Sequence, residues 1–563
     1  MPDVPGLKQM LMLSKRHPRW DALLLWVAFS MLPAVLLAQA STYVPNLDPV
    51  YQDLDALVAE GLVREIILGE RPYSRVAFAR FAQEARRRID TAGEEGIKAR
   101  FLEALERIER RFDRELAVLA DGAATYPDTD PRVWIREAFV DATAADSPSR
   151  EMTTRYNPPA DFIDGDLNPL LQNNQGRVLG DSWALGVESL LELQLGSRLA
   201  VQARPRIWVD SGRGGQNGGA DATLLEAYAR TLIGPVSLEL GRNHVALGQG
   251  PQGGPILSHN ARGLNMVRLS FERPLRLPGP LGALGLWHFN SLIADMGSNR
   301  HVSHSKLIVN RLGWRPSAHL EFGLTTLSHQ GGEGGPAAGR FSQRFKDAYL
   351  FFIPGQFNFS DRVVGADVRL TIPAIRSELY LNGFTTDDRG HFQQQAGGLW
   401  WDAVWVAGFR VAGMGDQGRI DLWGEIRHAG GTPHTHHQFT SGLTLDRRVI
   451  GDFMGPLASG FQGGVDWRGQ RDRVLGLAAW ERYSGDDWFV GRPDPLIKGF
   501  DWQRLADNPD EVRLRTIVEW TRFPGVTGLQ TTLRLGYEHV SRFNFTEADR
   551  SNVLVQLEAG YVW

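Results

Sequence analysis

The sequence contains no cysteine and, after its first forty residues, no long hydrophobic run. The absence of cysteine excludes a disulfide scaffold and any zinc or iron–sulfur centre held by thiolates. The 563 residues include 61 basic and 65 acidic ones, a formal net charge of −4, so charge gives no reason to expect a nucleic-acid partner. Mean hydropathy is −0.25, which together with the missing runs excludes a mature protein that crosses a membrane with helices.

One apolar run, residues 22–37, lies near the start of the chain. Lys15, Arg16 and Arg19 precede it, and Ala38-Gln39-Ala40 follows it. A basic stretch, an apolar stretch and a small-residue end describe a secretory signal peptide. A membrane anchor is the alternative, but the run falls short of the ~20 residues that a spanning helix needs. We therefore predict a signal peptide over residues 1–40, cleaved near Ala40.

Residues 41–125 show the periodicity of helices. Val50, Leu54 and Val58 fall on one face of a first helix. Ser74 is placed to cap a second helix, and the apolar spacing over residues 97–116 predicts a third. These short amphipathic helices form a small bundle over residues 41–125, which we expect to act as a packing or plug element of the main domain.

From Arg132 onward the apolar period changes to two. Leu514 and Val518, for example, alternate with Arg513, Arg515 and Glu519. We count about eighteen such segments, each near the ~10 residues of a strand that spans an outer membrane. A soluble sandwich or propeller also alternates, with strands of ~5–6 residues, so alternation alone leaves both architectures open.

Three further features favour a membrane barrel. The last strand ends in Tyr561 and Trp563, which resembles the terminal signal that barrel assembly machinery reads in bacterial outer membranes. The lack of cysteine suits passage through an oxidising periplasm. Aromatic residues also recur near strand ends, as interface girdles require: Trp208, Trp287, Trp314, Trp400, Trp401, Trp405, Trp520 and Tyr537. The predicted fold is all-β, a transmembrane outer-membrane β-barrel of about 18 antiparallel strands over residues 126–563, preceded by the small N-terminal α-helical bundle.

No catalytic motif accompanies this pattern. The G-x-G-x-x-G match at residues 248–253 is followed by Gly254 and Pro255 rather than by a helix, so it does not indicate dinucleotide binding. Four histidines crowd one loop, but no carboxylate stands at a spacing that would complete a metal site, and a solvated loop is favoured: His428, His434, His436 and His437. We predict no enzyme activity, cofactor or metal; an outer-membrane hydrolase with no visible motif stays open as an alternative.

The residues expected to face the lumen carry charges of both signs. The basic ones are Arg204, Arg206, Arg369, Arg427, Arg513, Arg515 and Arg534, and the acidic ones are Asp367, Asp421, Glu425, Glu519 and Glu538. They would serve either as the lining of a porin-like channel for anionic or sugar solutes or as a salt-bridged filling that closes the lumen. Because the two signs are interspersed, the filling is favoured.

The long polar segments between strands are the expected extracellular loops, and they carry aromatic residues. Aromatic rings can stack on sugars or cap the rim of a barrel. We therefore select five of them as candidate glycan contacts: Tyr349, Phe351, Phe352, Trp488 and Trp502.

The whole chain after the signal resembles the outer-membrane capsule assembly proteins of the Wzi type. The likeness lies in the order of parts, in Tyr43-Val44-Pro45 and Arg71-Pro72-Tyr73-Ser74-Arg75, and in a motif that runs from Gly241-Arg242-Asn243 through Gly248-Gln249-Gly250 to residues 256–262. Within that motif we single out Gly241, Arg242, Gly248, Gly250, Ser258 and Asn260. The chain has Leu247 and Gln249 where the family more often has tryptophan and proline.

The resemblance implies an eighteen-stranded barrel whose helical bundle faces the periplasm. It also implies a role in organising or attaching capsular polysaccharide or exopolysaccharide at the cell surface, by binding and without catalysis. The expected partners are that polysaccharide, outer-membrane lipid and the barrel assembly machinery.

Overall fold

The computed structural model describes residues 40–93, 95–120, 132–146, 150–152, 156–157, 165–177, 179–212, 218–251, 253–337, 339–349, 359–386, 403–431, 433–436, 438–490, 502–524 and 527–563. The predicted signal segment up to residue 39, the loop residues Phe351 and Phe352, and the girdle candidates Trp400 and Trp401 lie outside these ranges. Within them, no helix has the length and apolar character needed to cross a membrane.

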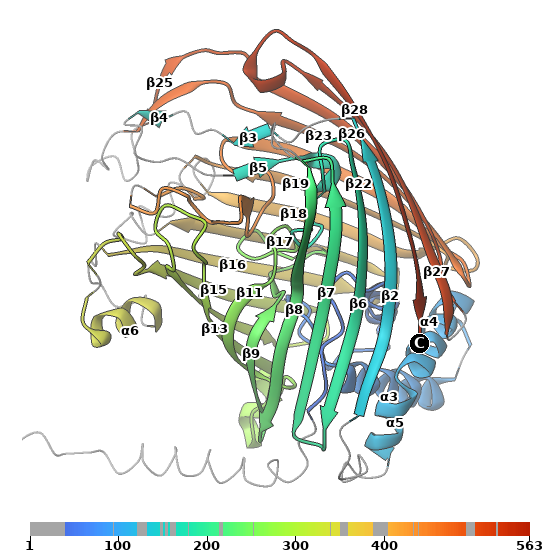
Figure 1. Cartoon of the computed structure of the whole chain (residues 1–563). Helices are drawn as coiled ribbons and strands as arrows, with labels where there is room; N and C mark the ends of the chain where they lie inside the picture. Colours follow the sequence, from blue (N-terminus) through green and yellow to red (C-terminus); the bar gives the residue numbers. More distant parts are fainter. Residues whose placement is uncertain are drawn as a thin grey trace, which may run out of the picture.

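Eighteen strands in the described ranges close into one antiparallel barrel (Figure 1). Each strand pairs with its neighbours in chain order, and β28 returns to β2, with Ala138 opposite Tyr561. This closure leaves the barrel without a free edge. The strands are β2 (Arg132–Ala145), β6 (Trp183–Leu195), β7 (Leu199–Asp210), β8 (Gly219–Ile233), β9 (Val236–Asn243), β11 (Leu264–Phe271), β13 (Leu286–Asp295), β14 (Lys306–Arg315), β15 (Leu320–Gln330), β16 (Ser360–Ile372), β17 (Ser377–Thr386), β18 (Val404–Met414), β19 (Ile420–Ala429), β22 (Ala458–Arg468), β23 (Asp472–Tyr483), β26 (Glu511–Arg522), β27 (Gly528–Ser541) and β28 (Arg550–Val562).

Burial follows the period-two pattern along the strands. On β26, Leu514 and Val518 are half exposed on the outer face, while Arg513 and Arg515 are buried on the inner face. An apolar outside and a charged inside are the arrangement of a barrel whose wall faces lipid. The inverted pattern predicted from the sequence is confirmed.

Two of the residues predicted for the aromatic girdle pack together on the wall. Trp287 and Trp314 stack at a ring distance of 5.4 Å, and Phe322 continues the stack at 5.3 Å. Trp208 was assigned to the girdle wrongly. Its side chain lies on the buried inner face, where its indole N–H donates to Asp210, because its position on β7 has the same parity as the inward Arg206.

In the described residues before the barrel the helices are α2 (Val50–Ala59), α3 (Arg75–Ala92), α4 (Ala99–Arg111) and α5 (Asp113–Ala120). Ser74 caps α3 as predicted, accepting a hydrogen bond from the Ala77 N–H. The single helix predicted over residues 97–116 is wrong, because the chain bends at Phe112. The Phe112 ring is buried against Phe78, so α5 turns back to pack on α3.

These helices lie at the end of the barrel where the strand connections are short. Lys98 donates to the carbonyls of Gly413 and Gly415 in one short turn, and Arg376 of another turn pairs with Glu60. Figure 1 shows α3, α4 and α5 grouped beside the end of β28, with α6 (Phe341–Tyr349) on the opposite side of the barrel. The other small elements are β12 (Leu275–Arg276), which extends the pairing on β13, and, along the long connections, β3 (Arg150–Met152), β4 (Tyr156–Asn157), β5 (Gly165–Leu167), β20 (Thr444–Leu445), β21 (Arg448–Val449), β24 (Asp487–Val490) and β25 (Trp502–Ala506).

A segment between two of the helices and a long connection of the barrel wall meet inside the barrel. Strands β9 and β11 are only eight residues long, so the connection 244–263 departs from the wall early and folds inward. Its short strand β10 (Ala246–Leu247) pairs with β1 (Glu70–Arg71), which lies between α2 and α3. Apolar residues of this loop form a buried core with inward side chains of the wall and with Leu443, Leu445 and Ile450 of the connection 430–457.

Candidate functional site

The inner face of the barrel is held together by ion pairs. Arg515, buried in the lumen, donates to Glu481 at 2.9 Å, and Arg513 donates to Glu538 at 3.1 Å. Further pairs repeat this pattern around the barrel: Arg204–Glu188, Arg206–Asp141, Arg369–Glu378, Arg427–Glu425 and Arg534–Glu519. Asp421 pairs with Arg410 and with Arg100 of α4. The inward charges of both signs are therefore paired with each other, as expected of a salt-bridged filling.

The motif loop forms the centre of this filling. Gln249 is fully buried, and its side-chain amide donates to Asp367 at 2.7 Å and to Glu321 at 3.0 Å. Its backbone N–H donates to the side-chain oxygen of Asn382 at 2.5 Å. Proline, which the resembled family more often has here, lacks both groups, so Gln249 gives this chain polar links of its own between loop and wall.

The two motif glycines beside Gln249 have backbone conformations that suit glycine. Gly248 has a φ of +106° and Gly250 one of +103°, in a region that L side chains rarely adopt. A Cβ on Gly248 would also lie 2.6 Å from the backbone of Gly254. Gly241 has a φ of +133°, and a side chain there would collide with the Ala227 carbonyl.

The remaining motif residues brace the loop. Ser258 donates to the Gly451 carbonyl at 2.6 Å, and Asn260 donates to the Val449 carbonyl at 3.0 Å. Arg242 donates to Asn265 and to the Leu224 carbonyl. The motif is therefore a structural device that fixes the inward loop, and its residues make protein contacts in place of an open binding surface.

Three of the candidate loop aromatics lie within the described residues. Tyr349, at the end of α6, stacks on Phe345 at 4.8 Å, and its hydroxyl lies 3.3 Å from the Ser291 hydroxyl of the wall. Trp488 and Trp502 lie on the paired strands β24 and β25, where Trp502 is opposite Val490. These strands extend to β4 and form a small sheet at the long-connection end.

The histidine loop is not the solvated loop predicted. His434 is buried edge-on against the Phe384 ring, and burial lowers its pKa to about 4. His428 lies 2.9 Å from the Ser459 hydroxyl, and His436 packs against Phe439. His437 lies outside the described residues. In the part of the chain that the structure describes, no three histidine or carboxylate side chains come close enough to hold a metal ion.

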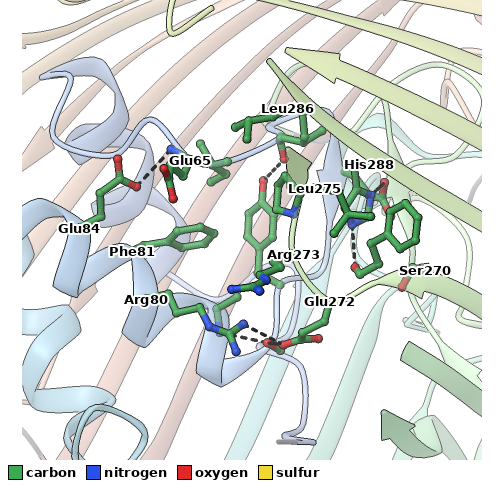
Figure 2. A pocket seen from close by; sticks show the side chains of 18 of the residues that line it. Glu65, Arg80, Phe81, Glu84, Ser270, Glu272, Arg273, Leu275, Leu286 and His288 are labelled. Atoms are coloured by element: carbon green, nitrogen blue, oxygen red, sulfur yellow. Dashed lines mark hydrogen bonds and ion pairs between the residues drawn. The ribbon is translucent and has the colours of Figure 1, made fainter. Parts of the chain in front are cut away.

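Two polar cavities escaped the sequence analysis. One of about 400 Å³ lies in the lumen, with Arg177, Arg473 and Glu558 in its lining. The other, of about 610 Å³, lies at the short-turn end between the helices and the wall (Figure 2). Arg80 and Arg87 of α3 line the second cavity and stand seven residues apart on one helix face. This seven-residue spacing is the one feature of the sequence that could have indicated the cavity. Arginines on one face of a helix are ordinarily solvated, however, so the spacing alone does not predict a site.

The comparison with family models decides the family. The model of the capsule assembly protein Wzi matches residues 163–553, well over half of the chain. The chain belongs to the Wzi capsule assembly family. No curated protein sequence matches it. Its barrel is therefore of the outer-membrane type, as predicted.

A solved structure supports the fold of this Wzi-family chain. The Escherichia coli protein Wzi, described as an outer-membrane protein involved in group 1 capsule assembly and as a carbohydrate-binding β-barrel, superposes with a TM-score of 0.62 and 16% identity. The match covers 92% of this chain and 99% of that one. Acinetobacter baumannii OccAB1 and Pseudomonas aeruginosa OprD match with TM-scores of 0.41 and 0.40, each at 10% identity, over 76% and 78% of this chain and 97% of theirs.

Proposed function

We propose that this protein organises or attaches capsular polysaccharide or exopolysaccharide at the bacterial cell surface, as a non-catalytic outer-membrane barrel. The observation that carries the proposal is a barrel of the Wzi family whose lumen is filled by paired charges and an inward loop. A filled lumen leaves the outer surface and the long connections as the places where a polymer can be held.

The lengths of the connections support the proposed orientation. Outer-membrane barrels have short turns on the periplasmic side and long loops outside. The helices would then cover the periplasmic mouth as a plug, after removal of a signal peptide near Ala40. The half-exposed outward residues would contact outer-membrane lipid, and the terminal Tyr561 and Trp563 would serve recognition by the barrel assembly machinery.

The long-connection end is the proposed polysaccharide surface. Tyr349 lies at that end with its ring stacked on Phe345, and β24 and β25 bring Trp488 and Trp502 onto neighbouring strands. Stacking on aromatic rings would hold sugars without a catalytic group. The porin-like alternative is less favoured, because the inward arginines are engaged with carboxylates instead of lining an open path.

The test is deletion of the gene, followed by staining of surface polysaccharide on whole cells. We expect polysaccharide to be released into the medium, and complementation with the wild-type gene to restore it to the surface. Complementation with Trp488→Ala/Trp502→Ala should restore the barrel, seen as heat-modifiable mobility, without restoring attachment. Normal surface polysaccharide in the deletion strain would refute the proposal. Steady single-channel conductance in planar bilayers would favour the porin instead.

A further inference from the structure

The cavity at the short-turn end has no role in the proposed surface function. It is lined by α3, by the segment that leads from β1 to α3, and by the inner side of β11 and β13, and it opens to solvent on one side (Figure 2). Its volume of about 610 Å³ lies within the roughly 300–1,000 Å³ of small-molecule sites. Its lining combines arginines with the apolar side chains Phe81, Leu275 and Leu286.

Positive charge is in excess on one side of this cavity. Glu272 accepts hydrogen bonds from the Ser74 hydroxyl at 2.7 Å and from Arg230, and it lies 3.6 Å from the Nη1 of Arg80. That Nη1 is buried and makes no hydrogen bond within the described residues. Burial, with the charges of Arg273 and Arg230, lowers the pKa of Arg80 to about 10, so the group stays cationic at neutral pH.

Two more guanidinium groups reach the cavity. Arg273 follows β11 and Arg87 stands on α3, and neither side chain makes an ion pair or hydrogen bond with the part of the chain that is described. Figure 2 shows Arg273 and Arg80 extending toward each other, with Phe81 beside them.

Glu272 pairs with Arg80, but the other carboxylates of the cavity do not neutralise Arg273 and Arg87. Burial raises the pKa of Glu70, but His288 and Arg268 outweigh it and lower that pKa to about 2, and both partners hold the carboxylate at 2.9–3.0 Å. Glu84 accepts from the N–H groups of residues 64 and 65 and from Arg88. Glu65, whose side chain is exposed, is the remaining carboxylate in the lining.

We propose that this cavity binds an acidic sugar unit, with Arg273, Arg87 and Arg80 holding its carboxylate or phosphate and Phe81 packing against its ring. Guanidinium groups match the planar oxygens of carboxylates and phosphates, and the apolar face of a sugar packs on an aromatic ring. The choice of a glycan rests on the proposed function; the site itself is a second one, at the opposite mouth from the surface loops. A polymer would thus meet the barrel first from the periplasmic side.

The experiment measures binding of a glucuronate-containing tetrasaccharide to the full-length protein in detergent. Losing one charged hydrogen-bonding partner should weaken binding about tenfold, so we expect this loss in Arg273→Gln and in Arg87→Gln. Arg110→Gln is the matched control, since Arg110 is exposed on α4 and donates only to its own helix at the Glu106 carbonyl. Uncharged maltotetraose should not bind. Modification of Arg273 and Arg87 by phenylglyoxal, mapped by mass spectrometry, should be suppressed by the tetrasaccharide.

Three results would overturn the inference. The first is that maltotetraose binds as tightly as the acidic tetrasaccharide. The second is that both arginine variants keep the wild-type affinity and the tetrasaccharide does not protect the arginines from phenylglyoxal. The third is that inorganic phosphate binds as tightly as the tetrasaccharide, which would indicate a simple anion site. Folding of each variant is checked by heat-modifiable mobility. Because this binding is measured on purified protein and polysaccharide attachment is measured on cells, a failure of the cavity and a failure of the surface function are seen separately.

Discussion

Arg311 on β14 and Asp367 on β16 form a two-pronged ion pair across the intervening strand β15, directly over Gly323. The guanidinium donates at 2.5 and 2.9 Å, and the Arg311 side chain is fully buried. A Cβ on Gly323 would collide with both partners. Asp367 also accepts from Gln249, so the pair holds the inward loop as well as the wall.

The same arrangement recurs elsewhere on the inner face. Arg206 and Asp141 pair over Gly186 of β6, and a Cβ there would again collide with the guanidinium. Tyr380 donates to Glu425 at 2.7 Å over Gly408 of β18. An inward glycine on the middle strand therefore leaves room for polar side chains of the two flanking strands to meet above it. A larger residue at that position would block this contact.

Substitution of Gly323 tests this role. Gly323→Ala should destabilise the barrel by about 1–3 kcal/mol, because the added methyl group must displace a buried ion pair. Gly476→Ala is the matched control, since a Cβ at that strand position meets nothing within 4 Å. Urea unfolding in detergent measures both. Equal stabilities of the two variants would contradict the proposed role of the glycine.

Breaking the pair from one side should cost more than replacing both partners. Arg311→Met leaves the Asp367 carboxylate buried without its cation, for an expected loss of about 3–5 kcal/mol. Arg311→Met/Asp367→Leu removes both charges and should recover most of that loss. The double-mutant cycle is measured by the same unfolding assay, and strictly additive single effects would show that the two residues do not interact.

The sequence allowed the wall to be predicted better than the lumen. Alternation on β26 and the closing strand at Tyr561 are local patterns, and both are read within ten residues of the chain. The partner of Arg515 lies 34 residues away, and Gln249 reaches Asp367 over 118 residues, so neither contact leaves a local signal. Trp208 shares the inward side of β7 with Arg206, and the recurrence of aromatic residues near strand ends does not by itself distinguish the two faces of a strand.

The candidate site was less predictable for the same reason. The inward course of the loop at 244–263 depends on β9 and β11 being short, and strand length is set by where pairing stops rather than by composition. The break between α4 and α5 occurs at Phe112, because the Phe112 ring stacks on Phe78 of α3. The motif glycines are predicted only from the family resemblance, because the positive φ that suits glycine at these positions is set by the folded course of the loop.

Glu321 holds the segment that precedes β1 in its position inside the lumen. Its carboxylate accepts the N–H groups of Leu68 and Gly69, each at 2.8 Å, and is buried. Glu321→Ala should leave both amides without partners, at about 1–3 kcal/mol for each unsatisfied group. Hydrogen exchange at residues 68 and 69 should then accelerate.

Glu333→Ala serves as the control for this prediction. Its carboxylate accepts from the Ser303 hydroxyl at the exposed surface, far along the chain from the lumen segment. Exchange at residues 68 and 69 should keep its wild-type rate in that variant. Unchanged protection in Glu321→Ala would mean that β1 is held by its pairing with β10 alone.

The stability of the filled lumen should also depend on pH through His259. This side chain of the inward loop is fully buried, and neither ring nitrogen has a hydrogen-bond partner within the described residues. Burial, reinforced by Arg71 and His244, lowers its pKa from 6.5 to about 3. The neutral ring is therefore compatible with the fold and the charged ring is not.

The sign follows from the proton count. Above pH 6.5 the ring is neutral in both the folded and the unfolded chain, so His259 makes stability independent of pH there. Between pH 6.5 and about 3 the unfolded chain binds a proton that the folded chain does not. The free energy of unfolding therefore falls by about 1.4 kcal/mol for each unit by which the pH is lowered. His259→Leu removes this contribution, and its unfolding free energy should decline less steeply from pH 6.5 to 5 than that of the wild type, with the two slopes converging above pH 7. If the unfolding free energies of the variant and the wild type decline in parallel over the acidic range, His259 does not contribute to the pH dependence of stability.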